Sequence, residues 1–505
     1  MLLAACNGTW DAVDIVALDM GQRWNFVAKQ KVVTQALALG VSLEIMYQPA
    51  LAGEKTRQQW NMDKLRAVEA KSGADLVSAQ FACEMDSRDS LAHLRSEFVV
   101  PKVNQVGGKS GTDNGDKECI YMCGNSLGLQ PKRARRVVCE ELDEWAHKGV
   151  TGHFRHAQQR PWVSYREPVV AKMAPIVGAK PAEVGVMNSL TTNIHLMLAA
   201  FYRPTAQRYK VLIEGKAFPS DHYAVESQIR WHELPANAML LAEPRPGEHT
   251  LRTNDILDLI AREGASIAVV MLSGVQYYTG QAFEIARITA AAQASGCVVG
   301  WDLAHAAGNV PLHLHDWNVD FACWCTYKYM NSGPGGIAGF FVHERHTDNS
   351  DLRRLLGWWS HDQRTRFDMT NEFVPSPGAA GFELSNTPIL TSAALLGALQ
   401  VFELAPLQRL HQKSVLLTTY LEHLLLARVG SHIQIITPQK HRGAQLSLLF
   451  ASEHVFTRVF DALTRAGVVC DERKPNCIRI APVPLYNSFS DVWQCVDTIY
   501  SAVAH

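Results

Sequence analysis

The sequence predicts an α/β protein with a large domain on a mostly parallel sheet and a smaller α+β domain at its C-terminal end. From about residue 185, apolar strand-like runs alternate with amphipathic helical segments, which is typical of a parallel sheet covered on both faces. After about residue 390, two long helical stretches precede short strands, which indicates a separate unit. The predicted parts are an extension at 1–55, an N-terminal arm at 56–150, a large domain at 151–390 and a small domain at 391–505.

Three buried strands and one helix define the large domain. The apolar runs at 209–215, 267–273 and 297–302 have the length and the β-branched content of strands. Between the last two runs, residues 281–295 (QAFEIARITAAAQAS) predict a helix. Because ligands of such sheets bind at the carboxyl ends of the strands, polar residues there are candidate site residues.

The small domain is predicted from helical spacing followed by short strands. Residues 391–404 carry Leu395 and Leu399 on one helical face, and Pro406 should break or kink this helix. A second helical stretch to about 427, strands at 432–437 and 444–450, and helices near 452–466 and 488–503 complete the domain.

Charge and cysteine content narrow the class of protein. Lys and Arg number 48 against 49 Asp and Glu, so no basic excess indicates a nucleic-acid partner. The 11 cysteines include no zinc-type pair of C-x-x-C motifs, which favours reduced thiols and a cytoplasmic protein. We expect no signal peptide, because the first residues (MLLAAC) lack a basic region and reach Asp11 before an apolar region can form. We expect no membrane helix, because no run of about 18 apolar residues lacks charge.

Residues 325–336 (CTYKYMNSGPGG) carry the most chemical information. They set Lys328 between two tyrosines, in an apolar run that ends in a glycine-rich turn. A partly buried lysine amine is suited to Schiff-base chemistry, as in the enzymes that use pyridoxal 5′-phosphate (PLP). The alternative is a lysine whose stem lies along a strand end with its amine in water, and this window does not separate the two.

Asp302 ends the predicted strand CVVGWD and should stand at the carboxyl edge of the sheet. PLP requires an acid against its pyridine nitrogen, because the protonated ring withdraws electrons from the substrate. The segment between Asp302 and Lys328 is long enough for one connection and one more strand. A lone aspartate at a strand end is more often a helix cap, but the pair with Lys328 favours a PLP site.

A phosphate site is predicted at 188–193 (NSLTTN), which precedes the helical run IHLMLAAFY. Backbone N–H groups and hydroxyls at a helix start bind anions. Plain N-capping by Ser189 or Thr191 would use the same residues, so this alternative stays open. Tyr327 could add its phenol to the phosphate or relay protons.

Other polar and aromatic clusters are weaker candidates. His313 and His315 (HLHD) could bind a metal, but a short polar run near a strand end is more typical of surface, and no metal is predicted. His153 and His156 are ambiguous in the same way. The pair at 358–359 (WW) could stack on an aromatic substrate or form a buried pair.

Several segments resemble the kynureninase family, in the same order along the chain and over about residues 56–505. They are YMCGNSLGLQPK (121–132), RPWVSYRE (160–167), MNSLTTNIHLM (187–197), AFPSDHYA (217–224), LSGVQYYTGQ (272–281), GWDLAHAAGN (300–309), CWCTYKYMNSGPGG (323–336), GWWSH (357–361), ELSNTPI (383–389) and RIAPVPLYNSF (479–489). The resemblance implies a PLP-dependent enzyme of fold type I (aminotransferase-like) and a homodimer. It implies hydrolysis of L-kynurenine or 3-hydroxy-L-kynurenine to anthranilate or 3-hydroxyanthranilate plus L-alanine, in tryptophan degradation and NAD biosynthesis.

The resemblance also implies roles for single residues. Lys328 binds the cofactor covalently, Asp302 pairs with the pyridine nitrogen, and Tyr327 is the third catalytic residue. The implied cofactor-binding residues further include Leu190, Thr191, Phe218, Asp221, Ser273, His305, Trp358 and Asn386, some of them reached across a dimer interface. The implied substrate-binding residues are Arg479 for the α-carboxylate, His153 and Asn386 for the aromatic ring, and Ser126.

Two alternatives remain at the level of sequence. Another PLP enzyme of fold type I, either an aminotransferase or a cysteine-desulfurase-like enzyme, would share the Lys328 motif. Desulfurases need a nucleophilic cysteine on a mobile loop, and no cysteine here is flanked by suitable turn residues.

Residues 1–55 resemble a fragment of the p30-type ribonuclease P protein subunit, which suggests an RNA-binding scaffold, but the neutral charge argues against it. About 50 residues cannot close a barrel of that size, so we expect a poorly packed extension.

Overall fold

The computed structural model describes residues 15–19, 42–46, 54–108, 116–347 and 352–504. It divides into two compact units, Met1–Ala67 and Val68–His505. In the first unit, β1 (Ile15–Asp19) pairs in parallel with β2 (Ser42–Met46), and α3 (Glu54–Ser72) runs across the boundary. The remainder of the predicted extension lies outside the described residues.

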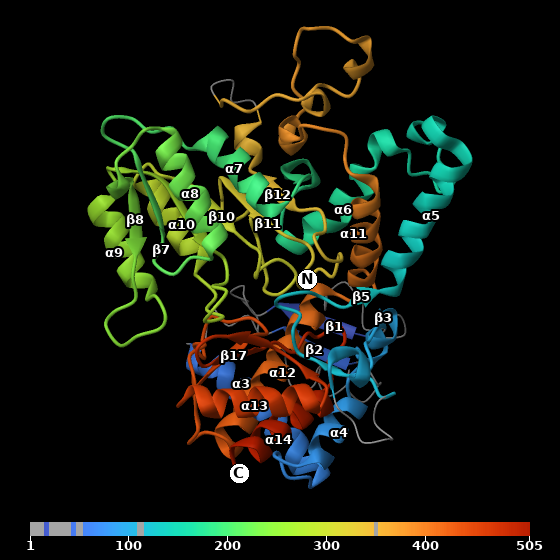
Figure 1. Cartoon of the computed structure of the whole chain (residues 1–505), viewed down its shortest axis with the longest axis vertical. Coiled ribbons are helices and arrows are strands. Elements are labelled where there is room, and N and C mark those ends of the chain that lie inside the picture. Colours follow the sequence, from blue (N-terminus) through green and yellow to red (C-terminus); the bar gives the residue numbers. More distant parts are fainter. Residues whose placement is uncertain (1–14, 20–41, 47–53, 109–115, 348–351, 505) are drawn as a thin grey trace, which may run out of the picture. The chain divides into compact units, whose positions relative to one another are not determined.

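A seven-stranded sheet forms the centre of the second unit, in the order β6-β12-β11-β10-β9-β7-β8 (Figure 1). Only β12 runs antiparallel to its neighbours, so the sheet is mostly parallel, as predicted. Its strands are β6 (Val184–Val186), β7 (Lys210–Glu214), β8 (Met239–Ala242), β9 (Ile267–Ser273), β10 (Val298–Asp302), β11 (Phe321–Trp324) and β12 (Gly339–Val342).

Helices cover both faces of this sheet. Alternate strand residues point to opposite faces, and the apolar residues on each face form a separate core with the helices packed there. On β9, Val270 and Leu272 belong to one core, whereas Val269 and Met271 belong to the other. The helices that supply the first core include α6 (Arg166–Val177), α9 (Thr253–Glu263), α10 (Ile285–Ala294) and α11 (Ile389–Phe402). The helices of the second core are α7 (Leu190–Phe201) and α8 (Pro219–Trp231).

A four-stranded antiparallel sheet, in the order β13-β14-β17-β16, lies in the C-terminal part of the chain. Its elements are β13 (Ile433–Ile435), β14 (Leu446–Phe450), β16 (Asp471–Arg473) and β17 (Cys477–Ile480), with helices α12 (Leu407–Arg428), α13 (Glu453–Arg465) and α14 (Phe489–Val503). Helix α14 packs against α12, α13 and α4 (Ala79–Ser87). Two small pairs join β3 (Phe98–Val99) to β5 (Gln130–Pro131) and β4 (Ile120–Tyr121) to β15 (Val468–Val469).

The predicted strands and helices are confirmed, with shifted ends. The helix predicted at 281–295 begins only at Ile285, because Gln281 and Ala282 form isolated β-bridges with other segments. Pro406 separates α11 from α12, and α11 packs on α6 and on α5 (Lys132–Lys148). Among the described residues, no single helix has the length and apolar character to cross a membrane, although the bent pair α11 and α12 meets that test jointly.

Candidate active site

A cavity of about 150 Å³ lies at the carboxyl edge of the central sheet. The strand ends place Glu214 of β7, Ser273 of β9 and Asp302 of β10 in its wall. The cavity is lined by Ser189, Leu190, Thr191, Glu214, Phe218, Ser220, Asp221, Ser273, Val275, Tyr277, Asp302, Ala304, His305, Tyr327, Lys328, Gly335 and Gly336. The sheet thus brings together all the predicted catalytic residues and most of the predicted cofactor-binding residues.

The loop after β11 presents Lys328 to the cavity. The Gly128 N–H donates a hydrogen bond to the Tyr327 carbonyl oxygen at 2.8 Å, which pins this loop to the 123–128 segment. A Cβ atom on Gly128 would lie 2.4 Å from the Lys328 carbonyl oxygen, so this close approach requires glycine. The Lys328 amine lies 5.9 Å from the centre of the Phe218 ring. Burial raises the pKa of the neighbouring Tyr327 phenol, which therefore stays protonated.

Asp302 and Asp221 form a buried, hydrogen-bonded pair of carboxyl groups. Burial raises the pKa of both, and the pKa of Asp221 rises further because it also faces Asp302 and Glu214. Asp302 accepts a hydrogen bond from the Ala304 N–H at 2.8 Å and lies near the Lys328 amine, and both contacts favour its anion. The proton therefore resides on Asp221 and the charge on Asp302.

Two more polar side chains complete this part of the wall. The Ser273 hydroxyl donates to Glu214 at 2.5 Å, and the Ser273 N–H donates to the second oxygen of the same carboxylate at 3.1 Å. Burial raises the pKa of Glu214. Burial, and then the charge of Lys328, lower the pKa of His305 well below its usual value, so its ring is neutral.

The start of α7 meets the start of α8 at the far side of the cavity. The hydroxyls of Thr191 and Ser220, one from each helix, are hydrogen-bonded at 2.5 Å. Ser189 occupies the N-cap position of α7, but its side chain makes no capping bond and instead contacts Thr192 at 3.1 Å. The plain capping alternative is therefore wrong for Ser189, and the N–H groups at the start of α7 are suited to an anion.

The remaining predicted residues do not line this cavity. Arg479 of β17 is buried, forms an ion pair with Asp471, and donates to the carbonyl oxygen of Tyr277 at 2.5 Å. Since Tyr277 lines the cavity and accepts this bond through its backbone carbonyl, Arg479 lies behind the cavity wall. Burial lowers the pKa of Arg479 to about 10. Ser126 lies in the segment that pins the Lys328 loop.

Trp358 belongs to an exposed aromatic patch, which we define as Val150, Phe154, Trp358, Phe367 and Met369. His153 is half-buried beside this patch, with its ring 6.3 Å from that of Phe154. Phe367 contacts both Phe154 and Trp358 at ring distances of 5.6 Å, and His153 precedes Phe154 in the chain. Trp359 is buried and Trp358 is 51% exposed, so the alternative of a buried tryptophan pair is wrong for Trp358. The Asn386 side-chain oxygen is buried and has no hydrogen-bond partner among the described residues.

Sequence reasoning missed several lining residues. Glu214 ends the strand KVLIE as Asp302 ends CVVGWD, so the same strand-end signal could have found it. Ser220 and Tyr277 lie in segments quoted for the family resemblance, but no local pattern marks them. Gly335 and Gly336 follow Lys328 in a turn whose glycines carry no ligand-specific signal.

The chain is similar to several known proteins. Residues 410–499 match the model of the kynureninase C-terminal domain. Kynureninase of Nematostella vectensis is 50% identical over 453 residues, spanning 87% of this chain and 97% of that protein. Kynureninase of Mus musculus is 48% identical over 452 residues, spanning 87% and 96%. Among solved structures, a mutant of C-DES with glycine covalently linked to its PLP cofactor is similar in fold, with a TM-score of 0.64 and 16% identity over 76% of this chain and 96% of that one.

Proposed function

We propose a function for this chain from one premise, namely that it belongs to the kynureninase family. It is a PLP-dependent hydrolase that cleaves kynurenine between Cβ and Cγ, giving an anthranilate and L-alanine. One observation carries the assignment to particular residues: Lys328, the ionised Asp302 and the paired helix starts meet around one cavity. The ribonuclease P resemblance of residues 1–55 has no support in the comparisons, and we propose that this extension is dispensable for the reaction.

The cavity fits the cofactor chemically. Asp221 Oδ1 and His305 Nδ1 are buried and have no hydrogen-bond partner among the described residues, as expected of groups that await a ligand. Leu190, Thr191 and Ser220 would hold the phosphate, Phe218 would pack on the ring, and Asp302 would pair with its nitrogen. When bound, PLP supplies an electron-withdrawing ring that stabilises negative charge at the substrate Cα.

Each side chain has a task that its environment supports. The Lys328 amine would hold the cofactor and, as a base, would move the proton at the substrate Cα. Asp302 stays anionic because Asp221 takes the shared proton, so it can hold a proton on the pyridine nitrogen. The protonated Tyr327 phenol can donate, and neutral His305 can accept or donate through its ring nitrogens. Arg479, behind Tyr277, is suited to the substrate α-carboxylate.

The aromatic patch supports a homodimer. Val150 and Met369 are 76% and 74% exposed, and large exposed apolar clusters mark association surfaces. His153, Trp358 and Asn386 line no part of the cavity within one chain. We propose that two copies meet at this patch and complete the substrate end of each other's site.

The substrate ring supplies a further proposal. We infer that 3-hydroxy-L-kynurenine is favoured over L-kynurenine by at least roughly tenfold in kcat/KM, because His153 and Asn386 can bond the 3-hydroxyl. A site built for a hydroxyl leaves polar groups unpaired without it, at a cost of about 1–3 kcal/mol.

Free cysteines throughout the described chain support placement in the cytoplasm, and the products suit tryptophan degradation and NAD biosynthesis.

Steady-state kinetics of the purified holoenzyme test this function. Hydrolysis of both kynurenines with stoichiometric L-alanine, and no sulfide from L-cysteine, is the expected result. Borohydride reduction followed by peptide mapping should place the cofactor on Lys328. Sulfide release without kynurenine hydrolysis would assign the chain to the desulfurase alternative, and equal kcat/KM values would refute only the substrate preference.

A further inference from the structure

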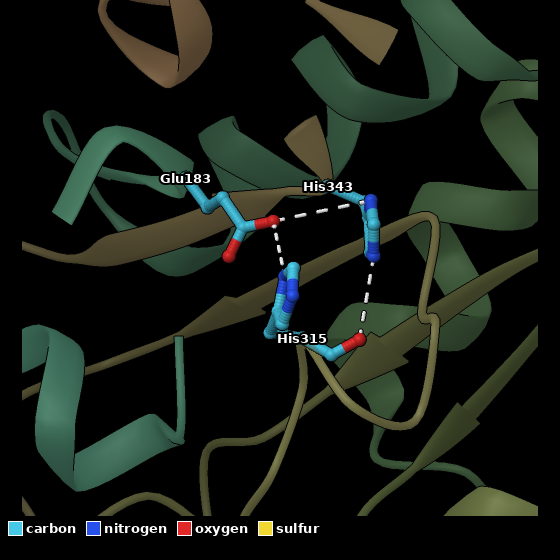
Figure 2. A group of neighbouring side chains, drawn as sticks. All are labelled: Glu183, His315 and His343. Atoms are coloured by element: carbon cyan, nitrogen blue, oxygen red, sulfur yellow. Dashed lines mark hydrogen bonds and ion pairs between the residues drawn. The ribbon is translucent and has the colours of Figure 1, made fainter. Parts of the chain in front are cut away.

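Three ligating side chains meet at the edge of the central sheet opposite the active-site cavity. Glu183 immediately precedes β6, His343 immediately follows the antiparallel β12, and His315 lies in the connection from β10 to β11 (Figure 2). Their ligand atoms all lie within 4.8 Å of one another, and within the described chain no other group of three or more such residues does so. The site is therefore independent of the cavity that holds Lys328.

The geometry resembles that of a partial tetrahedron. Figure 2 shows ring nitrogens of both histidines facing one carboxylate oxygen of Glu183. That oxygen is 2.9 Å from His315 Nδ1 and 3.9 Å from His343 Nδ1, and the two rings stack at 5.0 Å with only 14° between their planes. Ligands about 2.0 Å from a tetrahedral zinc ion lie roughly 3.3 Å apart, a value that these two distances bracket.

The Glu183 carboxylate is buried and held in place from behind. Its Oε1 accepts a hydrogen bond from the Glu344 N–H at 2.9 Å, and its Oε2 accepts one from the Lys180 N–H at 2.9 Å. Such contacts orient the carboxylate and leave Oε1 directed at the two rings. This arrangement matches the second layer of hydrogen bonds that fixes the ligands of protein metal sites.

The hydrogen bonds of His343 fix which of its ring nitrogens carries the proton. His343 Nε2 faces the His315 carbonyl oxygen at 3.3 Å, so Nε2 carries the proton. His343 Nδ1 accepts a hydrogen bond from the Arg345 N–H at 3.1 Å, so that N–H engages its lone pair. The same Nδ1 atom lies 3.9 Å from Glu183 Oε1, beyond hydrogen-bond distance, and an ion between the two atoms would take the lone pair in place of the Arg345 N–H.

We propose that Glu183, His315 and His343 bind one Zn²⁺ ion through Glu183 Oε1 and the two Nδ1 atoms, with water in the fourth position. Two imidazoles and one carboxylate are a ligand set that zinc accepts. Binding releases the His315 Nδ1 proton, so the ion replaces that proton in the contact with Glu183, and at His343 Nδ1 the ion replaces the hydrogen bond from the Arg345 N–H. The ion ties together three chain segments at this edge of the sheet and has a structural role. His313, the other histidine of the HLHD run, instead packs on Trp317 at 5.5 Å.

Zinc binding to the holoenzyme, with wild type compared against His315→Asn, tests the proposal. Asparagine keeps an N–H donor for Glu183 but is a poor zinc ligand, so this variant should fold. His313→Asn is the matched control, because His313 is exposed, lies in the same run and is not part of the cluster. Equilibrium dialysis should show one equivalent of Zn²⁺ fewer in His315→Asn than in wild type or His313→Asn. Zinc should raise the Tm of wild type and of His313→Asn by on the order of 2 °C and should leave the Tm of His315→Asn unchanged.

The outcomes separate this site from adventitious binding at cysteines and from the catalytic assignment. Kynurenine hydrolysis should be unchanged in His315→Asn, because the cluster lies at the opposite edge of the sheet. Equal zinc content in wild type and His315→Asn, or no binding by wild type, would overturn the proposal. X-ray absorption at the zinc edge on the wild-type holoenzyme gives a test that needs no variant. Nitrogen and oxygen neighbours including imidazoles are expected, and a sulfur-dominated shell would refute it.

Discussion

In the active-site cavity, Asp302 is ionised and the adjacent Asp221 is protonated, and we expect the charge of Asp302 to affect kcat. Asp302→Asn should leave PLP bound but lower kcat by more than roughly tenfold, since an amide cannot keep the pyridine nitrogen protonated and one pKa unit corresponds to about 1.4 kcal/mol. Visible absorbance of the purified variant would verify cofactor content, and stopped assays on kynurenine would give kcat. Near-normal turnover with full cofactor would rule out the role of Asp302.

Asp221 should cost the folded protein stability at neutral pH. Its folded pKa lies well above the ordinary 3.8, mainly because of burial. The free energy of unfolding is therefore highest below pH 3.8, where this pKa difference has no cost, and it falls as the pH rises through the folded pKa of Asp221. Asp221→Asn keeps a donor for Asp302 and removes this penalty, so it should raise the Tm of the apoenzyme at pH 7 by on the order of 1–3 °C.

The pH series provides the control for this prediction. The difference in Tm between Asp221→Asn and wild type should narrow as the pH falls from 7 toward 4, because the unfolded wild-type chain then begins to bind the proton that folded Asp221 already holds. A constant difference across this range would indicate a packing effect and not a proton penalty.

The paired starts of α7 and α8 should determine how tightly the phosphate is held. Thr191→Ala removes a hydroxyl from this pair and should weaken PLP affinity by roughly three- to tenfold, as expected for one lost hydrogen bond. Titration of apoenzyme with PLP, followed by absorbance, measures the effect. Thr192→Ala is the control, because Thr192 is exposed and does not line the cavity. Equal losses in the two variants would point to weakening of the helix itself.

Strands and motifs were accessible from sequence to different degrees. The run IAVVMLS at 267–273 was predicted with its final bounds, because a short apolar run of β-branched residues has few alternatives inside an α/β fold. The helix at 281–295 was predicted too long, since its first residues bridge to segments that local periodicity cannot reveal. Element type follows from local pattern, whereas element ends follow from tertiary partners.

The same distinction applies to the candidate sites. Asp302 and Lys328 were found because each sits in a recognisable local setting, a strand end and a tyrosine-flanked turn. Phe218 and Asp221 were found only through family resemblance. Glu183 and His343 are separated in sequence by most of the large domain and meet at β6 and β12, which are neighbours in the sheet but not in the chain. No periodicity or spacing in a single sequence encodes that meeting.

The complete enzyme should be a dimer that depends on the aromatic patch. Val150→Glu combined with Met369→Glu places charge in an apolar contact and should convert the dimer to the 56.0 kDa monomer in sedimentation velocity. Hydrolysis should fall with it, because the substrate end of the site is then incomplete. Trp231→Glu is the matched control, since Trp231 is 84% exposed on α8 outside the patch. A wild-type monomer with full activity would refute the proposal.

The ion pair of Arg479 with Asp471 has a consequence for the end of the catalytic cycle. In the role that we propose for Arg479, a substrate α-carboxylate that reaches this guanidinium would displace Asp471 or share it, so Asp471 would compete with the substrate. After cleavage, L-alanine keeps that carboxylate but has lost the aromatic ring that helped to anchor it. Asp471 then competes against a weaker ligand, and product departure is favoured. We therefore expect the Arg479–Asp471 ion pair both to weaken substrate binding and to speed the release of L-alanine.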